Sequence, residues 1–219
     1  HDAIRKSGSF DTTVEKIAVI RRAGIRCAVM TTVSGTNIRE IPDIIDLVVA
    51  RHVDIFAFGR YCPTSFEKST HIEPLEYRDF LERIWQKFEQ YKDSGATFNL
   101  KDHLWTLFLY EKGLFKIPEG LDNDTIYDGC HCGDCHMTIL PTGRVMACRR
   151  FESEVGNVFR EHIHDIYNGE RMNGYRRYEK FEKCSRCELL RFCRGCPAVA
   201  YGYTHDFYAL DPQCWKEIK

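Results

Sequence analysis

The stretch Cys184-Ser-Arg-Cys187-Glu-Leu-Leu-Arg-Phe-Cys193-Arg-Gly-Cys196 carries the strongest structural signal in this sequence. Its four thiols are separated by 2, 5 and 2 residues, which is too dense for a hydrophobic core and too short for disulfides that close loops. Soft thiolate ligands at such intervals suit zinc or an iron–sulfur cluster. The stretch therefore predicts a metal-binding domain.

Further cysteines surround this stretch and exceed what one metal site needs. Nine of the eleven cysteines lie between residues 130 and 214; besides the four above, they are Cys130, Cys132, Cys135, Cys148 and Cys214. A disulfide framework does not fit, because the number of cysteines is odd and no secretory apolar segment precedes them. Nine thiolates can fill two sites, although structural zinc accepts the same intervals. The other two, Cys27 and Cys62, are predicted to be a core residue and a loop thiol.

The order of these cysteines resembles the SPASM domain of radical SAM enzymes. Cys130, the unit Gly143-x4-Cys148, the dense stretch and a final cysteine follow one another as in that family, although Cys193-Arg-Gly-Cys196 is one residue shorter than the usual ending. The resemblance implies two auxiliary 4Fe–4S clusters. The first would be held by Cys130, Cys148, Cys196 and either Cys132 or Cys135, and the second by Cys184, Cys187, Cys193 and Cys214.

The first hundred residues show a different pattern, in which helices alternate with buried strands. Apolar periodicity predicts helices at 13–23, 41–51 and 74–91, and strands at 25–33, 53–58 and 96–100. This alternation is typical of a parallel α/β sheet. Beyond it, we predict a helix at 104–114, a hairpin formed by 137–140 and 145–147, and a helix at 161–177.

Short fragments of this region resemble the second half of the radical SAM barrel. They are His1-Asp-Ala-Ile-Arg5, Ser9-Phe10, Thr32-Val33 with Asn37, and Arg60-Tyr-Cys-Pro63. The resemblance implies an α/β fold in which the C-terminal half of a partial (β/α)6 barrel precedes a small cysteine-rich SPASM domain with a β-hairpin and helices. The implied domains are residues 1–115 for the barrel half, 116–128 for a linker and 129–219 for the SPASM domain.

The same resemblance implies a binding site for S-adenosylmethionine. Arg5 matches a family arginine that contacts the cofactor carboxylate, and Thr32 and Asn37 lie at the exit of a strand, where ligands gather in such folds. The alternatives are a salt bridge on a helix for Arg5 and a turn or cap role for Asn37. The family's Cys-x3-Cys-x2-Cys motif, which holds the cluster that binds S-adenosylmethionine, does not occur in this sequence, so we expect it upstream.

Charged and polar neighbours of the cysteines are further candidates. Arg149 and Arg150 follow Cys148 and are candidates to stabilise a reduced cluster or to bind a peptide carboxylate, with solvated surface arginines as the alternative. Sulfatase-maturing members of the family carry an aspartate at the position of Arg149, which argues against that subfamily. His131 and His136 are expected to support the ligands rather than to bind metal.

Composition and charge exclude several partner classes. The sequence has 31 basic and 32 acidic side chains, so there is no basic excess for nucleic acid and no polybasic segment for a membrane surface. No apolar run reaches the length of a transmembrane helix. Together with the abundant thiols, these features predict a cytoplasmic protein in a reducing compartment.

The resemblance favours a radical SAM maturase of a ribosomally made precursor peptide. Such an enzyme takes an electron from a reductant such as flavodoxin or ferredoxin and cleaves S-adenosylmethionine to a 5′-deoxyadenosyl radical. Hydrogen abstraction from the peptide would then lead to a thioether or carbon–carbon crosslink, with loss of an electron to an auxiliary cluster. The alternatives are a radical SAM/SPASM enzyme that acts on a protein side chain or a small molecule, an iron–sulfur electron carrier and a zinc-ribbon interaction module.

Overall fold

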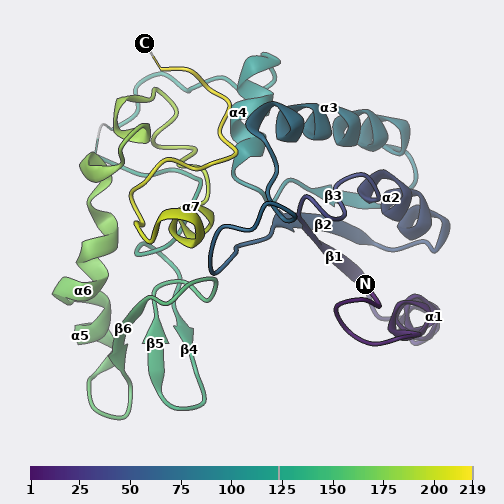
Figure 1. The fold of residues 1–219 in the computed structure, drawn as a ribbon, viewed down its shortest axis with the longest axis horizontal. Coiled ribbons are helices and arrows are strands. Elements are labelled where there is room, and N and C mark those ends of the chain that lie inside the picture. Colours follow the sequence, from purple (N-terminus) through teal and green to yellow (C-terminus); the bar gives the residue numbers. More distant parts are fainter. Residues whose placement is uncertain (123, 219) are drawn as a thin grey trace. The chain divides into compact units, whose positions relative to one another are not determined.

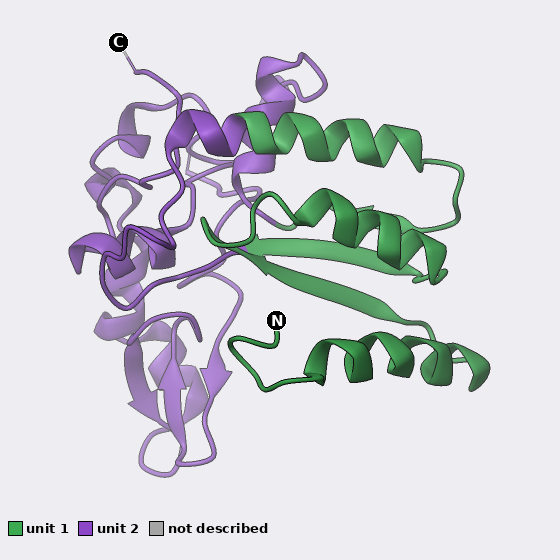
Figure 2. Cartoon of the chain, turned by 45° about the vertical axis from the view of Figure 1, so that its right-hand side comes forward, with its two compact units in different colours: residues 1–59, 79–101 green, residues 60–78, 102–219 purple. Residues whose placement is uncertain are grey.

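The computed structural model of this chain describes residues 1–122 and 124–218. The chain forms two compact units, coloured separately in Figure 2. Unit 1 comprises residues 1–59 and 79–101, and unit 2 comprises residues 60–78 and 102–219. Each unit is therefore built from two separate segments of the chain. The domain bounds implied by the family resemblance (1–115, 116–128 and 129–219) remain a prediction.

A three-stranded sheet forms the centre of the N-terminal part. Its strands β1 (Ala28–Val33), β2 (Ile55–Arg60) and β3 (Thr97–Asn99) lie in that order, and β2 pairs with β3 in parallel. Figure 1 shows α2 (Ile41–Ala50) and α3 (Pro74–Gln90) along β2 and β3, and α1 (Ser9–Arg22) next to the edge strand β1. The predicted alternation of helices and strands is confirmed.

Apolar side chains at helical spacing hold the helices against this sheet. α2 buries Ile41, Ile45 and Val48. On α3, Phe80 meets Phe58 of β2 edge to face with ring centres 5.3 Å apart, and Phe88 stacks on Phe98 of β3 at 4.3 Å. Removing such a continuous apolar face from water is the main driving force for this packing.

The ends of α1 differ from the prediction for local reasons. The helix begins at Ser9, because the carboxylate of Asp2 accepts hydrogen bonds from the backbone N–H groups of Gly8 and Phe10, at 2.7 and 2.8 Å. It ends where Gly24 adopts a φ of 71°, after which the N–H of Ile25 bonds back to Ile20. Ile25 thus closes the helix end, and β1 starts at Ala28, three residues later than predicted.

The C-terminal part of the chain contains short helices and a small antiparallel sheet. The strands are β4 (Thr138–Ile139), β5 (Arg144–Met146) and β6 (Glu154–Asn157), in that order, with α4 (Leu104–Glu111) preceding them in the sequence. The predicted hairpin is β4 and β5. After the sheet come α5 (Ile163–Asn168), α6 (Glu170–Asn173), three single 3₁₀ turns and α7 (Pro197–Thr204).

The single helix predicted at 161–177 is wrong. Gly169 is extended, with φ −70° and ψ 161°, and separates α5 from α6. A Cβ atom at this position would lie 2.8 Å from the carbonyl oxygen of Asp165, so glycine permits the sharp break. The sequence analysis also missed β6 and α7. α7 reads Pro-Ala-Val-Ala-Tyr-Gly-Tyr-Thr, an apolar run without a helical stripe.

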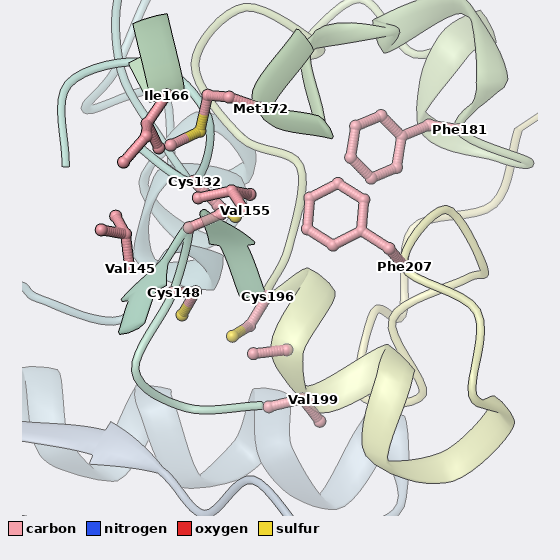
Figure 3. Close-up of a cluster of buried hydrophobic side chains, with 12 residues drawn as sticks. Cys132, Val145, Cys148, Val155, Ile166, Met172, Phe181, Cys196, Val199 and Phe207 are labelled. Atoms are coloured by element: carbon pink, nitrogen blue, oxygen red, sulfur yellow. The ribbon is translucent and has the colours of Figure 1, made fainter. Parts of the chain in front are cut away.

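The core of unit 2 combines aliphatic and aromatic side chains with cysteines. Val145, Val155, Val199 and Phe207 are buried here together with Cys132, Cys148 and Cys196 (Figure 3). α7 contributes one wall and comes very close to the loop after β2, because a Cβ atom at Gly202 would overlap the carbonyl oxygen of Pro63. Among the described residues, no helix combines the length and apolar character needed to cross a membrane.

Candidate metal centre

All eleven cysteines are free thiols, and eight of them gather into two groups in unit 2. Within each group, the charge of one thiolate raises the pKa of its neighbours. The first group contains Cys130, Cys132, Cys148 and Cys196. The second contains Cys184, Cys187, Cys193 and Cys214.

Three local structures position the first group. The loop 129–135 carries Cys130 and Cys132, and the backbone N–H of Cys132 lies 3.5 Å from the sulfur of Cys130. Cys148 follows β5, and its N–H donates to the hydroxyl of Ser153 at 3.0 Å. Cys196 directly precedes α7. Figure 3 shows the side chains of Cys148 and Cys196 converging within the buried core.

A tight turn fixes Cys196. Its backbone N–H donates to Oδ2 of Asp211 at 2.6 Å. The preceding Gly195 has a φ of 57°, and a Cβ atom there would overlap the Asp211 side chain. Glycine is therefore required for this turn, both by the left-handed backbone and by the close approach of the carboxylate.

Burial and mutual repulsion raise the pKa values of most thiols in the first group. Burial, together with the neighbouring sulfur atoms of Cys196 and Cys148, raises the pKa of Cys130 to about 12. Burial, followed by the neighbouring sulfur atoms of Cys130, Cys148 and Cys196, also raises the pKa of Cys132. Cys196 is the exception: its pKa is lowered by a hydrogen bond from Cys62 and by the charge of Arg150, against the effect of burial. Three buried thiols and the partly buried Cys130, which repel one another as anions, suit a cationic iron–sulfur core, which replaces their protons.

The second group lies in the stretch that opened the sequence analysis and in the C-terminal segment. A 3₁₀ turn starts at Cys184, and the N–H of Cys187 donates to its carbonyl at 3.0 Å. Burial and the nearby Cys214 and Cys187 raise the pKa of Cys184 to about 12, and burial raises that of Cys193. The ammonium group of Lys183 lies 3.7 Å from the sulfur of Cys214.

Two groups of four thiols match the ligand demand of two 4Fe–4S clusters, in which each iron takes one thiolate. Within the described part of the chain, no three His, Cys, Asp or Glu side chains are arranged to hold one metal ion. The donor set thus fits the predicted cofactor.

The choice between Cys132 and Cys135 now has a structural basis. Cys132 is buried beside Cys130 and Cys148, whereas Cys135 is exposed. The arrangement favours Cys132 as the fourth ligand, although the full set of ligands remains a prediction. His131 is exposed, and Nε2 of His136 is buried without a hydrogen-bond partner among the described residues.

The residues predicted to bind S-adenosylmethionine all lie in unit 1. Arg5 is exposed in the turn before α1, and Thr32 is an exposed residue of β1. Asn37 stabilises the turn that follows β1. Its Oδ1 accepts a hydrogen bond from the N–H of Ser34 at 2.9 Å, and its Nδ2 donates to the carbonyl of Thr32 at 2.9 Å. This is the turn role named as the alternative for Asn37, and a role in cofactor binding remains a prediction for all three residues.

Sequence reasoning missed a buried ionic network around Arg60, which is 2% exposed. Its guanidinium donates to Asp102 at 2.9 Å, to both carboxylate oxygens of Asp211 at 2.7 and 2.8 Å, and to Gln213 at 3.0 Å. Asp211 is also the acceptor for the N–H of Cys196. The sequence singled out Arg60 only as part of the fragment Arg60-Tyr-Cys-Pro63. Its partners could not be predicted, because they lie up to 153 residues away.

Arg150 connects the first thiol group to the same network. Its Nη1 lies 3.4 Å from the sulfur of Cys196, and its Nη2 donates to the backbone carbonyl of Arg60. Arg149, by contrast, is exposed. Of the two arginines that the sequence singled out, only Arg150 therefore reaches a thiol.

Comparisons with known proteins agree with this arrangement. Residues 130–188 match the family model SPASM, described as an iron–sulfur cluster-binding domain. An AdoMet-dependent heme synthase of Nitratidesulfovibrio vulgaris is 28% identical over 226 residues, which cover 98% of this chain and 60% of that protein. A protein of the same name from Methanosarcina barkeri is 28% identical over 230 residues, covering 98% and 63%. The chain thus spans about three-fifths of the length of these relatives.

Solved structures share the fold. SuiB of Streptococcus suis bound to S-adenosylmethionine superposes with a TM-score of 0.66 at 21% identity, covering 94% of this chain and 49% of SuiB. The enzyme anSMEcpe with bound AdoMet gives a TM-score of 0.66 at 13% identity, covering 94% and 54%. The predicted α/β fold class, equivalent to the C-terminal part of such proteins, is confirmed.

Proposed function

We propose that this chain, which has the fold and the cysteine domain of radical SAM/SPASM enzymes, supplies the distal barrel half and the auxiliary-cluster domain of such an enzyme. The observation that carries the proposal is the gathering of eight thiols into two groups of four. We assign residues 1–115 to the barrel half, 116–128 to a linker and 129–219 to the SPASM domain.

The residues of this chain would hold the clusters and shape their surroundings. When bound, 4Fe–4S clusters supply one-electron transfer. The buried thiols would hold them away from water. Arg150 beside Cys196 and Lys183 beside Cys214 would donate N–H···S hydrogen bonds, which favour the more negative, reduced form of a cluster. Arg5, Thr32 and Asn37 remain our candidates for contacts to S-adenosylmethionine.

A ribosomally made precursor peptide is our first candidate substrate. SuiB has been solved with its precursor peptide SuiA, and anSMEcpe with the Kp18Cys peptide, and both share the fold of this chain. By analogy, the enzyme would install a thioether or carbon–carbon crosslink in a peptide, in the cytoplasm and with flavodoxin or ferredoxin as reductant. We expect no nucleic acid and no membrane among its partners.

A heme-forming reaction is the second candidate. Three curated relatives, at 28%, 28% and 24% identity, are named AdoMet-dependent heme synthase, and each alignment covers 98% of this chain. These identities exceed those to SuiB and anSMEcpe, which is the specific observation in favour of this candidate. A third alternative, an electron carrier, shares the clusters but needs no S-adenosylmethionine.

The first experiment measures iron and acid-labile sulfide in the complete protein after anaerobic reconstitution. We expect about two 4Fe–4S clusters attributable to residues 130–214. Alanine at Cys148 should remove one of them and alanine at Cys187 the other. Stoichiometric zinc with negligible sulfide would contradict the proposal.

A second experiment separates the candidate reactions. The reduced protein is incubated with S-adenosylmethionine and either peptides encoded beside its gene or heme precursors, and 5′-deoxyadenosine and products are identified by mass spectrometry. A peptide that loses hydrogen supports the first candidate, and formation of heme supports the second. Absence of 5′-deoxyadenosine with every substrate would favour the electron carrier.

A further inference from the structure

A buried arginine lies between the two thiol groups. Arg194 directly follows Cys193 of the second group and precedes Cys196 of the first group by two residues. It is only 2% exposed. It is a ligand in neither group and has no role in the function proposed above.

The guanidinium group of Arg194 is hydrogen-bonded to the backbone of both groups. Its Nη2 donates to the carbonyl oxygen of Cys130, a member of the first group, at 2.5 Å. Its Nη1 donates to the carbonyl oxygen of Leu190, which lies between Cys187 and Cys193 of the second group, at 2.8 Å. Because the planar fork of arginine reaches two acceptors at once, it fixes the positive charge between the two segments.

This buried cation has no carboxylate partner among the residues that the structure describes. The guanidinium lies over the ring of Tyr178, 5.3 Å from its centre. The hydroxyl of Tyr178 donates to Asp134, but neither Asp134 nor another described acidic side chain forms an ion pair with Arg194. Arg60, which is also 2% exposed, differs in being paired with two carboxylates.

A buried positive charge is costly unless a negative charge compensates for it. Carbonyl dipoles and an aromatic ring compensate only in part. An oxidised 4Fe–4S core with four thiolates carries a net negative charge, and reduction by one electron makes it more negative. Two such cores, one at each thiol group, would supply the missing negative charge. Arginine stays protonated throughout, so its charge is present in both oxidation states.

We propose that Arg194 is the shared counter-cation of the two clusters and favours the reduced form of both. It binds neither iron nor sulfide and acts through its charge, which is effective over this range because the site excludes water. Arg150 and Lys183, in contrast, each approach a sulfur atom of one group only. This inference rests on the proposed function, because it needs a cluster at each thiol group.

The test separates charge from hydrogen bonding at this position in the complete protein. R194Q removes the charge but keeps two N–H donors, whereas R194K keeps the charge but loses the planar fork. The matched control is R186Q, because Arg186 lies between Cys184 and Cys187 but is exposed, so water and salt screen its charge. Each variant is combined with Cys148→Ala or Cys187→Ala, so that only one of the two clusters remains.

Midpoint potentials are measured by anaerobic titration with dithionite, and the reduced clusters are followed by electron paramagnetic resonance. A signal common to both backgrounds comes from neither group and serves as an internal control. We expect R194Q to lower the ratio of reduced to oxidised cluster at a fixed potential by about tenfold in both backgrounds, a shift of about 59 mV for one electron. R194K and R186Q should leave this ratio close to that of the parent protein.

An unchanged potential in R194Q, a shift confined to one background or an equal shift in R186Q would overturn the inference. An equal shift in R194K would also overturn it, because hydrogen-bond geometry rather than charge would then set the potential. If R194Q does not retain the clusters, iron and sulfide in R194K decide: retention supports the need for a charge, and loss overturns the inference. A wild type without cluster iron in this region would instead contradict the proposed function itself.

Discussion

Replacement of Arg60 should lower the unfolding free energy of unit 2 strongly. Replacing it with methionine leaves the buried carboxylates of Asp102 and Asp211 without their main partner. Breaking a buried pair in this way costs about 3–5 kcal/mol of unfolding free energy. Arg78→Ala is the matched control, because Arg78 pairs with Glu111 at 3.0 Å on the surface, where about 0–1 kcal/mol is expected. Urea denaturation measures both, and equal losses would contradict the ranking.

Asp102 should give unit 2 a characteristic response to acid. Burial raises the pKa of this carboxyl, but Arg60 and a backbone hydrogen bond from Leu104 outweigh burial, so the pKa is lowered in the folded state. A lowered carboxyl pKa contributes stability that is present above the unfolded value of about 4 and disappears as the pH falls through the folded value.

This pH dependence can be measured by urea titrations between pH 7 and pH 3. The midpoint of the wild type should fall steeply below about pH 4, where the folded Asp102 takes up its proton. In Asp102→Asn, the midpoint should be lower at pH 7 and the drop in this window shallower. An identical acid response in the variant would show that other carboxyls cause it.

At the scale of elements, α7 packs so closely against the loop after β2 that a larger side chain at Gly202 should destabilise the protein. Gly202→Ala places a methyl group where the carbonyl oxygen of Pro63 lies, so the helix or the loop must shift. Such overpacking costs about 1–3 kcal/mol. The control is Gly174→Ala, because a Cβ atom there meets nothing within 4 Å and the backbone is right-handed helical. Thermal melts should show a clear loss for the first variant only.

The elements show how far the sequence can be followed. α2 and α3 were predictable because their apolar residues recur at helical spacing. α7 was not, because it is apolar on all sides and buried, so its pattern contains no period. The break at Gly169 depends on a close approach to Asp165, which only the folded backbone reveals.

The parts of the candidate site that could be predicted are those whose residues lie close together in the sequence. The thiols of the second group are mostly close in sequence, so spacing alone grouped Cys184, Cys187 and Cys193. The first group joins Cys130 to Cys196, which lie 66 positions apart, and no spacing rule addresses such a separation. The Arg60 network is equally non-local. Resemblance supplied the long-range cysteine pattern, whereas the supporting polar contacts required the fold.

At the scale of the whole molecule, removal of the clusters should affect the two units differently. The cysteines of both groups lie in unit 2, where Cys132, Cys148 and Cys196 are part of the core. Metal binding contributes directly to the stability of such a domain. After chelation, hydrogen–deuterium exchange should accelerate in residues 130–148 and 184–214, while α2 and β2 keep their protection. A uniform acceleration in both units would contradict this expectation.

The position of Asp211 also dictates when the metal can be loaded during synthesis. During synthesis, Arg60 cannot form its hydrogen bonds to Asp211 until the chain is 151 residues longer. The backbone N–H of Cys196 depends on the same carboxylate. A nascent chain that has not yet exposed residue 211 contains Cys130, Cys132, Cys148 and Cys196 but lacks the group that fixes the last of them. We therefore predict that iron enters the first thiol group only after Asp211 has left the ribosome. Ribosome-bound chains arrested before Asp211 should take up no iron at these thiols, whereas released chains should; uptake by the arrested chains would refute this order of events.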